Sequence, residues 1–231
     1  MKSNQQTRTP GDTDRHLVLG QNGTGKTVLM VNAFAYRSYD VMPWVVANYK
    51  NDEHLNGIPG YREIGAHERL PSEPGIYMVR PEPEEGSLDN LLQQAYLRGA
   101  NNGGRANVGF FIDEGTEVGQ RSLPFRRVQT QGRSMRIPTI VGSQRPVWLS
   151  KYAFTEAKFF SVFPLNDIED RRIVSKWCKG LDVNYDETLA EYESYYFTGA
   201  TRHLVKMGPA KTPDELYQVF EDRRPRPRKR L

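Results

Sequence analysis

Short apolar runs alternate along the chain with longer segments whose apolar residues recur at helical spacing. The apolar runs predict strands at residues 16–19, 44–47, 76–79, 108–112, 139–142 and 159–163. Helices are predicted at residues 28–36, 87–100, 125–135 and 167–177. Strands that alternate with helices form parallel sheets covered on both faces. The pattern therefore predicts an α/β fold with a mainly parallel central sheet flanked by helices.

Other segments carry weaker patterns. Glycine and proline are frequent in residues 51–75, which predict loops, and Ser87 is expected to cap the helix that follows it. Residues 195–198 and 203–206 predict the two arms of a hairpin, and a last short helix is expected to start near Thr212. The C-terminal part of the fold is thus predicted to be a small hairpin and a helix.

A glycine-rich loop joins the first strand to the first helix and matches the phosphate-binding pattern G-x-x-x-x-G-K-[ST]. Backbone N–H groups in such a loop surround phosphates, and the helix N-terminus adds its positive end. Lys26 is predicted to reach the β and γ phosphates, and the Thr27 hydroxyl to bind Mg²⁺. The predicted nucleotide-binding residues are Gly20, Gln21, Asn22, Gly23, Thr24, Gly25, Lys26 and Thr27.

Two acidic residues, Asp113 and Glu114, follow the apolar run at residues 108–112. This is the Walker B pattern, in which Asp113 would hold the magnesium through water. Glu114 would orient and deprotonate the attacking water, a role that small-molecule kinases do not need because their acceptor is not water. The pair therefore favours hydrolysis of a nucleoside triphosphate.

A polar group ends the strand predicted at residues 139–142, where Ser143 and Gln144 follow. A glutamine at the tip of a strand beside the phosphate-loop strand can hydrogen-bond both the γ-phosphate and the attacking water. Arginines are dense in the same region and suggest phosphate contacts, pairs at a subunit interface or solvated positions. They are Arg121, Arg126, Arg127, Arg133, Arg136 and Arg145.

Three segments together resemble the FtsK-HerA superfamily of DNA-pumping ATPases: GQNGTGKT at 20–27, VGFFIDE at 108–114 and QGRSMRIPTIVGSQRP at 131–146. The resemblance spans residues 17–174 and implies a RecA-like (ASCE) P-loop NTPase core. Cellular members carry large extra domains. A bare core of this length is similar to the genome-packaging ATPases of tailless, membrane-containing double-stranded DNA viruses such as tectiviruses.

The resemblance also implies roles for particular residues. The superfamily's R-x(5)-R pattern falls on Arg127 and Arg133, and by this likeness Arg133 is the arginine finger that acts on a neighbouring subunit's site. Arg172 matches an arginine of the superfamily after the fifth strand. The implied catalytic residues are Glu114, Lys26, Gln144 and Arg133. Many members have an acidic residue after strand two, whereas residues 47–50 here are ANYK.

The implied activity is a Mg²⁺-dependent ATPase that translocates double-stranded DNA into a capsid, with ATP and Mg²⁺ as cofactors. The implied partners are double-stranded DNA, further copies in a hexameric or pentameric ring, and proteins of the packaging vertex, capsid or membrane. The implied location is the virion packaging vertex or the host cytoplasm. Alternatives are a Zot-like filamentous-phage assembly ATPase, a P-loop small-molecule kinase and a nucleotide-dependent scaffold without turnover.

The composition is that of a folded protein and fits a single domain. The 231 residues are 37% hydrophobic, which excludes a disordered chain and fits one domain at residues 16–221. No apolar stretch is long enough to span a bilayer, the polar segment at 1–15 lacks the apolar core of a signal peptide, and no integral membrane insertion is expected. The single Cys178 excludes an intrachain disulfide.

Positive charge is concentrated at the C-terminus. Residues 223–230 hold six cations, and subtracting six from the formal net charge of +4 leaves −2 for the rest of the chain. A run of arginines and prolines cannot propagate a helix and has little to bury. Residues 222–231 are therefore predicted to be a flexible basic tail, either solvated or bound to a polyanion such as DNA or to an acidic capsid or vertex partner.

Overall fold

The computed structural model describes residues 9–199 and 203–223, and the strands of this part form one nine-stranded sheet in the order β3-β4-β2-β5-β6-β1-β7-β8-β9. The strands are β1 (Arg15–Leu19), β2 (Pro43–Ala47), β3 (Arg62–Glu63), β4 (Gly75–Val79), β5 (Gly109–Ile112), β6 (Thr139–Ser143), β7 (Phe159–Val162), β8 (Ser194–Thr198) and β9 (His203–Met207). Every pairing from β3 to β7 is parallel, and β8 and β9 continue the sheet as an antiparallel hairpin. The predicted mainly parallel α/β fold is confirmed.

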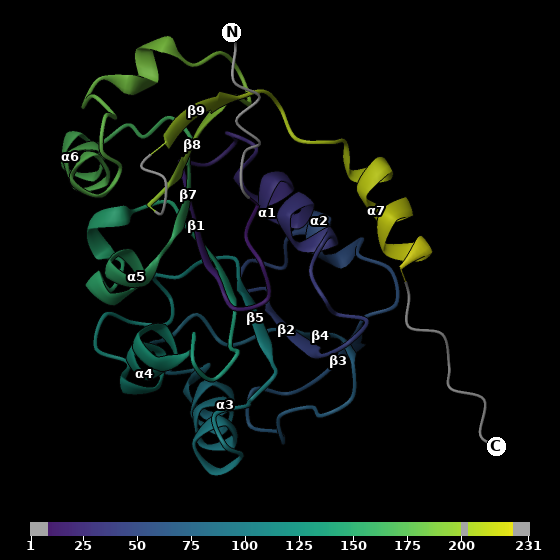
Figure 1. Cartoon of the computed structure of the whole chain (residues 1–231). Coiled ribbons are helices and arrows are strands. Elements are labelled where there is room, and N and C mark those ends of the chain that lie inside the picture. Colours follow the sequence, from purple (N-terminus) through teal and green to yellow (C-terminus); the bar gives the residue numbers. More distant parts are fainter. Residues whose placement is uncertain (1–8, 200–202, 224–231) are drawn as a thin grey trace, which may run out of the picture.

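Helices cover both faces of this sheet. They are α1 (Lys26–Ala35), α2 (Glu53–Asn56), α3 (Asp89–Asn101), α4 (Leu123–Gln131), α5 (Lys151–Glu156), α6 (Ile168–Trp177) and α7 (Pro213–Asp222), with short 3-10 turns η1 (Pro146–Trp148) and η2 (Tyr185–Thr188). Figure 1 shows α1, α2 and α7 on one side of the strands and α3, α4, α5 and α6 on the other. The sheet is thus covered on both faces, as the alternating pattern predicted.

Two hydrophobic cores form, one on each face. Alternate residues of β1 divide between them, since Leu17 and Leu19 enter the core under α3 to α6 while Val18 enters the core under α1 and α7. Aromatic rings dominate the second core, where Phe34 of α1 contacts the rings of Trp44, Phe111 and Phe220. Helix α1, which carries the end of the phosphate loop, is therefore fixed on a rigid aromatic base.

Several local expectations were wrong. Residues 51–75 are not all loop, because α2 and the two-residue strand β3 lie there, and Asp52 caps α2 through the backbone N–H of His54. Ser87 does not cap α3, which begins at Asp89; the Ser87 hydroxyl donates to the Tyr49 hydroxyl instead. Helix α4 ends at Gln131 rather than at residue 135. The backbone then turns through Arg136, whose φ of 53° is incompatible with a helix.

The C-terminal helix is anchored to α1. Its predicted start is confirmed, because Thr212 and Glu215 form a capping box. At its end, Arg223 donates to the carbonyl oxygen of Ala35, the last residue of α1, and pairs with Asp40 at 3.6 Å. Arg223, the first of the six C-terminal cations, therefore belongs to the folded part, while residues 224–231 of the tail lie outside the described residues.

Among the helices of the described part, none combines the length and the apolarity that crossing a membrane requires.

A buried histidine of β1 contacts the neighbouring strand β7. His16 of β1 is 3% exposed, and its Nε2 lies 2.9 Å from the Ser161 hydroxyl oxygen on β7. Burial lowers the pKa of His16 to about 3, and the nearby positive charge of Arg37 acts in the same direction. The imidazole is therefore neutral in the folded protein at neutral pH.

We expect the free energy of unfolding to decrease as the pH falls from about 6.5 toward 3. In that range the unfolded chain binds a proton at His16 and the folded chain does not, which costs up to about 1.4 kcal/mol per pH unit. Urea unfolding at several pH values checks this, with His16→Gln as the comparison because its amide can still reach Ser161. The variant should lose less stability on acidification, and parallel curves would contradict the assignment.

Candidate functional site

The phosphate loop runs from the end of β1 into α1 and is fixed at both ends. Gly20 N–H donates to the Ser143 carbonyl oxygen at 3.1 Å, and Gln21 N–H to that of Pro164 at 3.2 Å. A Cβ at Gly20 would lie 2.6 Å from the Cβ of Phe163, so only glycine fits there. Gly25 precedes α1 with a φ of 86°, a left-handed conformation that favours glycine and turns the chain into the helix. The loop geometry explains two glycines of the motif.

The loop brings a cation and a hydroxyl to the acids after β5. Lys26 begins α1 and is 5% exposed, and the Thr27 hydroxyl donates to Asp113 Oδ1 over 3.3 Å. Asp113 is 1% exposed, and its backbone N–H donates to the Ala47 carbonyl oxygen of β2. The sequence-predicted phosphate and metal residues thus lie together at the carboxyl edge of the sheet.

The surroundings of Asp113 disfavour the charged form of its side chain. Burial raises the pKa of Asp113; the positive charges of Lys26 and Lys50 oppose this, while the negative charges of Asp52 and Glu114 add to it. A carboxylate of this kind, paired with a hydroxyl oxygen at a helix N-terminus, has the hard oxygen donors that Mg²⁺ prefers. Thr27 and Asp113 therefore have the chemistry to hold a magnesium ion.

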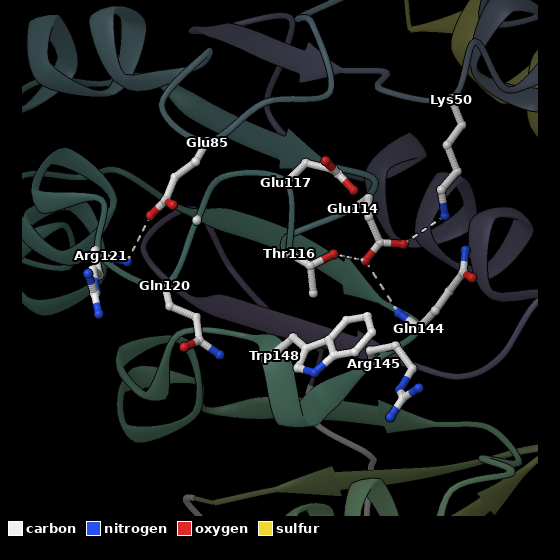
Figure 2. Close-up of a pocket in the computed structure, with 11 residues that line it drawn as sticks. Lys50, Glu85, Glu114, Thr116, Glu117, Gln120, Arg121, Gln144, Arg145 and Trp148 are labelled. Carbon is white, nitrogen blue, oxygen red and sulfur yellow. Dashed lines mark hydrogen bonds and ion pairs between the residues drawn. The ribbon is translucent and has the colours of Figure 1, made fainter.

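Glu114 is buried, with its side chain 5% exposed, and both of its carboxylate oxygens accept hydrogen bonds (Figure 2). Oε2 accepts from the Lys50 ammonium at 2.7 Å, and Oε1 accepts from the Thr116 hydroxyl at 2.9 Å and from the backbone N–H of Gln144 at 3.4 Å. The carboxylate is therefore held in one orientation by residues of three segments, which follow β2, β5 and β6.

Gln144 lies where the sequence predicted, directly after β6, and β6 is inserted between β5 and β1. Gln144 borders two cavities. One, of about 570 Å³, is lined by the phosphate loop and Asp113; the other, of about 680 Å³, is lined by Glu114, Glu117 and Trp148 and is the pocket of Figure 2. Lys50 also borders both, so these two residues separate the phosphate loop from the open cavity beside it.

The segment after β2 contributes residues that sequence reasoning missed. Lys50 stands where an acid was sought, yet it contacts the catalytic candidate Glu114. An acidic residue lies two positions later: Asp52 lines the phosphate-loop cavity, and its backbone N–H donates to Asn48 Oδ1 at 2.8 Å. The signal available in the sequence was the position of these polar residues at the end of a buried strand, which the loop-like composition of residues 51–75 obscured.

The arginines singled out in the sequence differ in whether their side chains make contacts within the described residues. Arg145 is a structural residue: it pairs with Asp167 and with the buried Asp170 of α6, and its guanidinium stacks on Trp148. Arg127 lies over the Tyr96 ring of α3, and Arg172 pairs with Glu169 within α6. These contacts supply an alternative explanation for part of the arginine-rich pattern.

Arg133 is different. It lies in the exposed turn after α4, and its side chain makes no hydrogen bond or ion pair within residues 9–199 and 203–223. Arg133 lies shortly before β6, where the Gly132 carbonyl oxygen accepts from the Ile137 N–H, and β6 starts at Thr139 opposite Arg15, the first residue of β1. The phosphate loop follows the last residue of β1, and a five-residue strand is roughly 15 Å long, so Arg133 lies at the opposite end of the strands from the phosphate loop of its own chain.

Comparisons with known proteins place these features in a family. No family model matches the chain. The DNA packaging ATPase P9 of Enterobacteria phage PRD1 is 33% identical over 223 residues, which cover 93% of this chain and 95% of P9.

Solved structures share the fold. The genome packaging NTPase B204 from Sulfolobus turreted icosahedral virus 2, in complex with AMPPCP, matches 87% of this chain and all of that chain with a TM-score of 0.67 and 14% identity. The pCW3 conjugation coupling protein TcpA, solved with ATPγS, matches 90% of this chain and 65% of that chain with a TM-score of 0.61 and 12% identity. Given the identity to P9 over nearly the whole of both chains, this protein belongs to the family of viral DNA-packaging ATPases that includes P9 of phage PRD1.

Proposed function

We propose that the protein is an ATP-driven motor that pumps double-stranded DNA into a viral capsid, acting at the packaging vertex of the virion or in the host cytoplasm. The observation that carries the hydrolytic part is the contact of Thr27 with Asp113 beside the buried Glu114. The kinship with P9 supports the packaging role over the Zot-like and kinase alternatives. Residues 224–231 are candidates to bind DNA or an acidic vertex protein.

In this proposal the nucleotide phosphates lie on the phosphate loop. The N–H groups at the start of α1 and the Lys26 ammonium bind them, and Thr27 and Asp113 would hold Mg²⁺. When bound, the metal neutralises charge on the phosphate oxygens. Lys26 is fixed by its burial at the start of α1, so its charge is already in place before the nucleotide arrives.

Glu114 would accept the proton of the attacking water, and the Gln144 side chain would orient that water. Glu114 Oε1 accepts two hydrogen bonds, whereas Oε2 accepts only from the Lys50 ammonium and keeps a free lone pair, so the access of water to Oε2 depends on where the Lys50 side chain lies. Lys50 is the contact that can leave, because its side chain is 41% exposed and flexible, whereas the other two donors are a neighbouring hydroxyl and a backbone amide. We infer that the ion pair of Lys50 with Glu114 marks a resting state.

A second copy would complete the site. Arg133 and the phosphate loop lie at opposite ends of the strands of one chain, so Arg133 would act on the nucleotide of a neighbouring copy and not on its own. Contacts between two different surfaces repeat head to tail and close into a ring if the rotation allows. We propose that such contacts close into a hexameric or pentameric ring around DNA.

Glu114→Gln should bind ATP with unchanged affinity and lose about 10²- to 10⁴-fold in turnover, because the amide keeps the shape of the carboxylate but cannot accept a proton. Nucleotide titration and phosphate release measure the two effects separately. Glu117→Gln, three residues along on the wall of the open cavity, is the matched control and should keep wild-type turnover. Normal turnover in Glu114→Gln would exclude Glu114 as the base.

Lys50→Met should raise turnover several-fold in the absence of DNA, because Glu114 Oε2 loses its ammonium partner and is open to water. Lys50→Arg keeps the charge and should behave like the wild type. A lower basal rate in Lys50→Met would show instead that Lys50 assists the reaction directly.

Arg133→Ala alone should lower the turnover of the assembled protein by about 10³-fold or more, the contribution typical of arginines supplied by a neighbour. Mixing Arg133→Ala with Lys26→Ala subunits should restore activity at interfaces where both halves are intact. Arg105→Ala removes another exposed arginine, from the turn between α3 and β5, and should have little effect. Full activity of Arg133→Ala, or of a dilute monomer, would refute the shared site.

A further inference from the structure

Tyr192 occupies a backbone conformation that tyrosine rarely adopts. It lies in a tight turn before β8, closed by a hydrogen bond from the Glu193 N–H to the Ala190 carbonyl oxygen, and its φ is 60°. Turns that require a positive φ usually place glycine or asparagine there. The ring is 47% exposed, so burial in the fold does not account for it.

The turn is held in place by its neighbours. Glu193 accepts from the Ala190 N–H at 2.7 Å and pairs with Lys206 of β9 at 2.6 Å, and Lys206 also donates to the Thr188 carbonyl oxygen. These contacts fix the turn to the hairpin at the end of the sheet. The tyrosine ring is therefore presented from a defined position rather than from a mobile loop.

The ring lies directly against the phosphate loop. A Cβ built on Gly25 would be 3.1 Å from Tyr192 Cδ1, so the ring packs on the last loop residue before α1. Tyr192 also lines the same cavity of about 570 Å³ as Lys26 and Thr27. A volume of this size is in the range of pockets that bind small ligands.

The lining of this cavity continues beyond the phosphate loop. Besides Lys26, Thr27 and Asp113 it includes Tyr192, Val28 and the linker between β9 and α7, residues 209–213. The linker is tied to α1, since Lys211 donates to the Tyr36 hydroxyl at 2.9 Å. A nucleoside attached to phosphates on the loop would lie within reach of these further lining residues, among which Tyr192 provides an aromatic ring.

We propose that the Tyr192 ring stacks on the base of the bound nucleoside triphosphate. The inference rests on the proposed nucleotide site and extends it from the phosphates to the nucleoside. Stacking uses the π face that every base presents, so Tyr192 would add affinity without choosing between adenine and guanine. By analogy with base–aromatic stacking in other proteins, the expected contribution is about 10- to 100-fold in affinity.

The test compares binding of ATP, GTP and inorganic tripolyphosphate by calorimetry to the full chain. Tyr192→Asn is the informative variant, because asparagine tolerates the positive φ of the turn and removes only the ring. ATP and GTP should each bind about 10- to 100-fold more weakly to it, and tripolyphosphate should bind as to the wild type. Tyr192→Phe should restore the affinity for both nucleotides.

Three results would overturn the inference. Wild-type affinity of Tyr192→Asn for ATP would show that the ring makes no contact with the base. An equal loss for tripolyphosphate would show that Tyr192 supports the loop rather than the nucleoside. A wild-type protein that binds neither ATP nor tripolyphosphate would refute the proposed nucleotide site, and the base contact with it, whereas a wild type that binds both equally would refute the base contact alone.

Discussion

The parallel register of the central strands is the constraint on which the site depends. β1 pairs with β6 from Arg15 to Leu19, and β2 pairs with β5 so that Ala47 lies opposite Ile112. The carboxyl ends of these four strands therefore meet at one edge, and each is followed by a group of the site: the phosphate loop, Lys50, the acidic pair and Gln144. A shift of one residue in any of these strands would turn its apolar side chains to the wrong face of the sheet.

Burial adds a second constraint at this edge. Lys26, Asp113 and Glu114 are all nearly inaccessible, and charges in such surroundings must be paired or hydrogen-bonded. Thr27 is the partner of Asp113, and Lys50 and Thr116 are partners of Glu114. The same low accessibility strengthens electrostatic interactions, which favours catalysis by charges that are already in position.

Much of this arrangement could be predicted from local patterns, because the motifs follow strands whose apolar runs are unmistakable. The phosphate loop, Asp113 and Glu114, and the position of Gln144 beside β1 all follow from that order. What could not be predicted depends on contacts between distant segments. Lys50 meets Glu114 across 64 residues, and Tyr192 reaches Gly25 from the far end of the chain, where neither the turn nor η2 has a distinct sequence signature.

The bond from Arg223 to the Ala35 carbonyl oxygen has a mechanical consequence. Helix α1 has ten residues and is about 15 Å long, with Lys26 at its N-terminal end and the hydrogen bond to Arg223 at its C-terminal end. The basic residues 224–231 continue the chain directly from that attachment. A load on that segment would therefore reach the C-terminal end of α1 through Arg223, while Lys26 lies at the N-terminal end of the same helix.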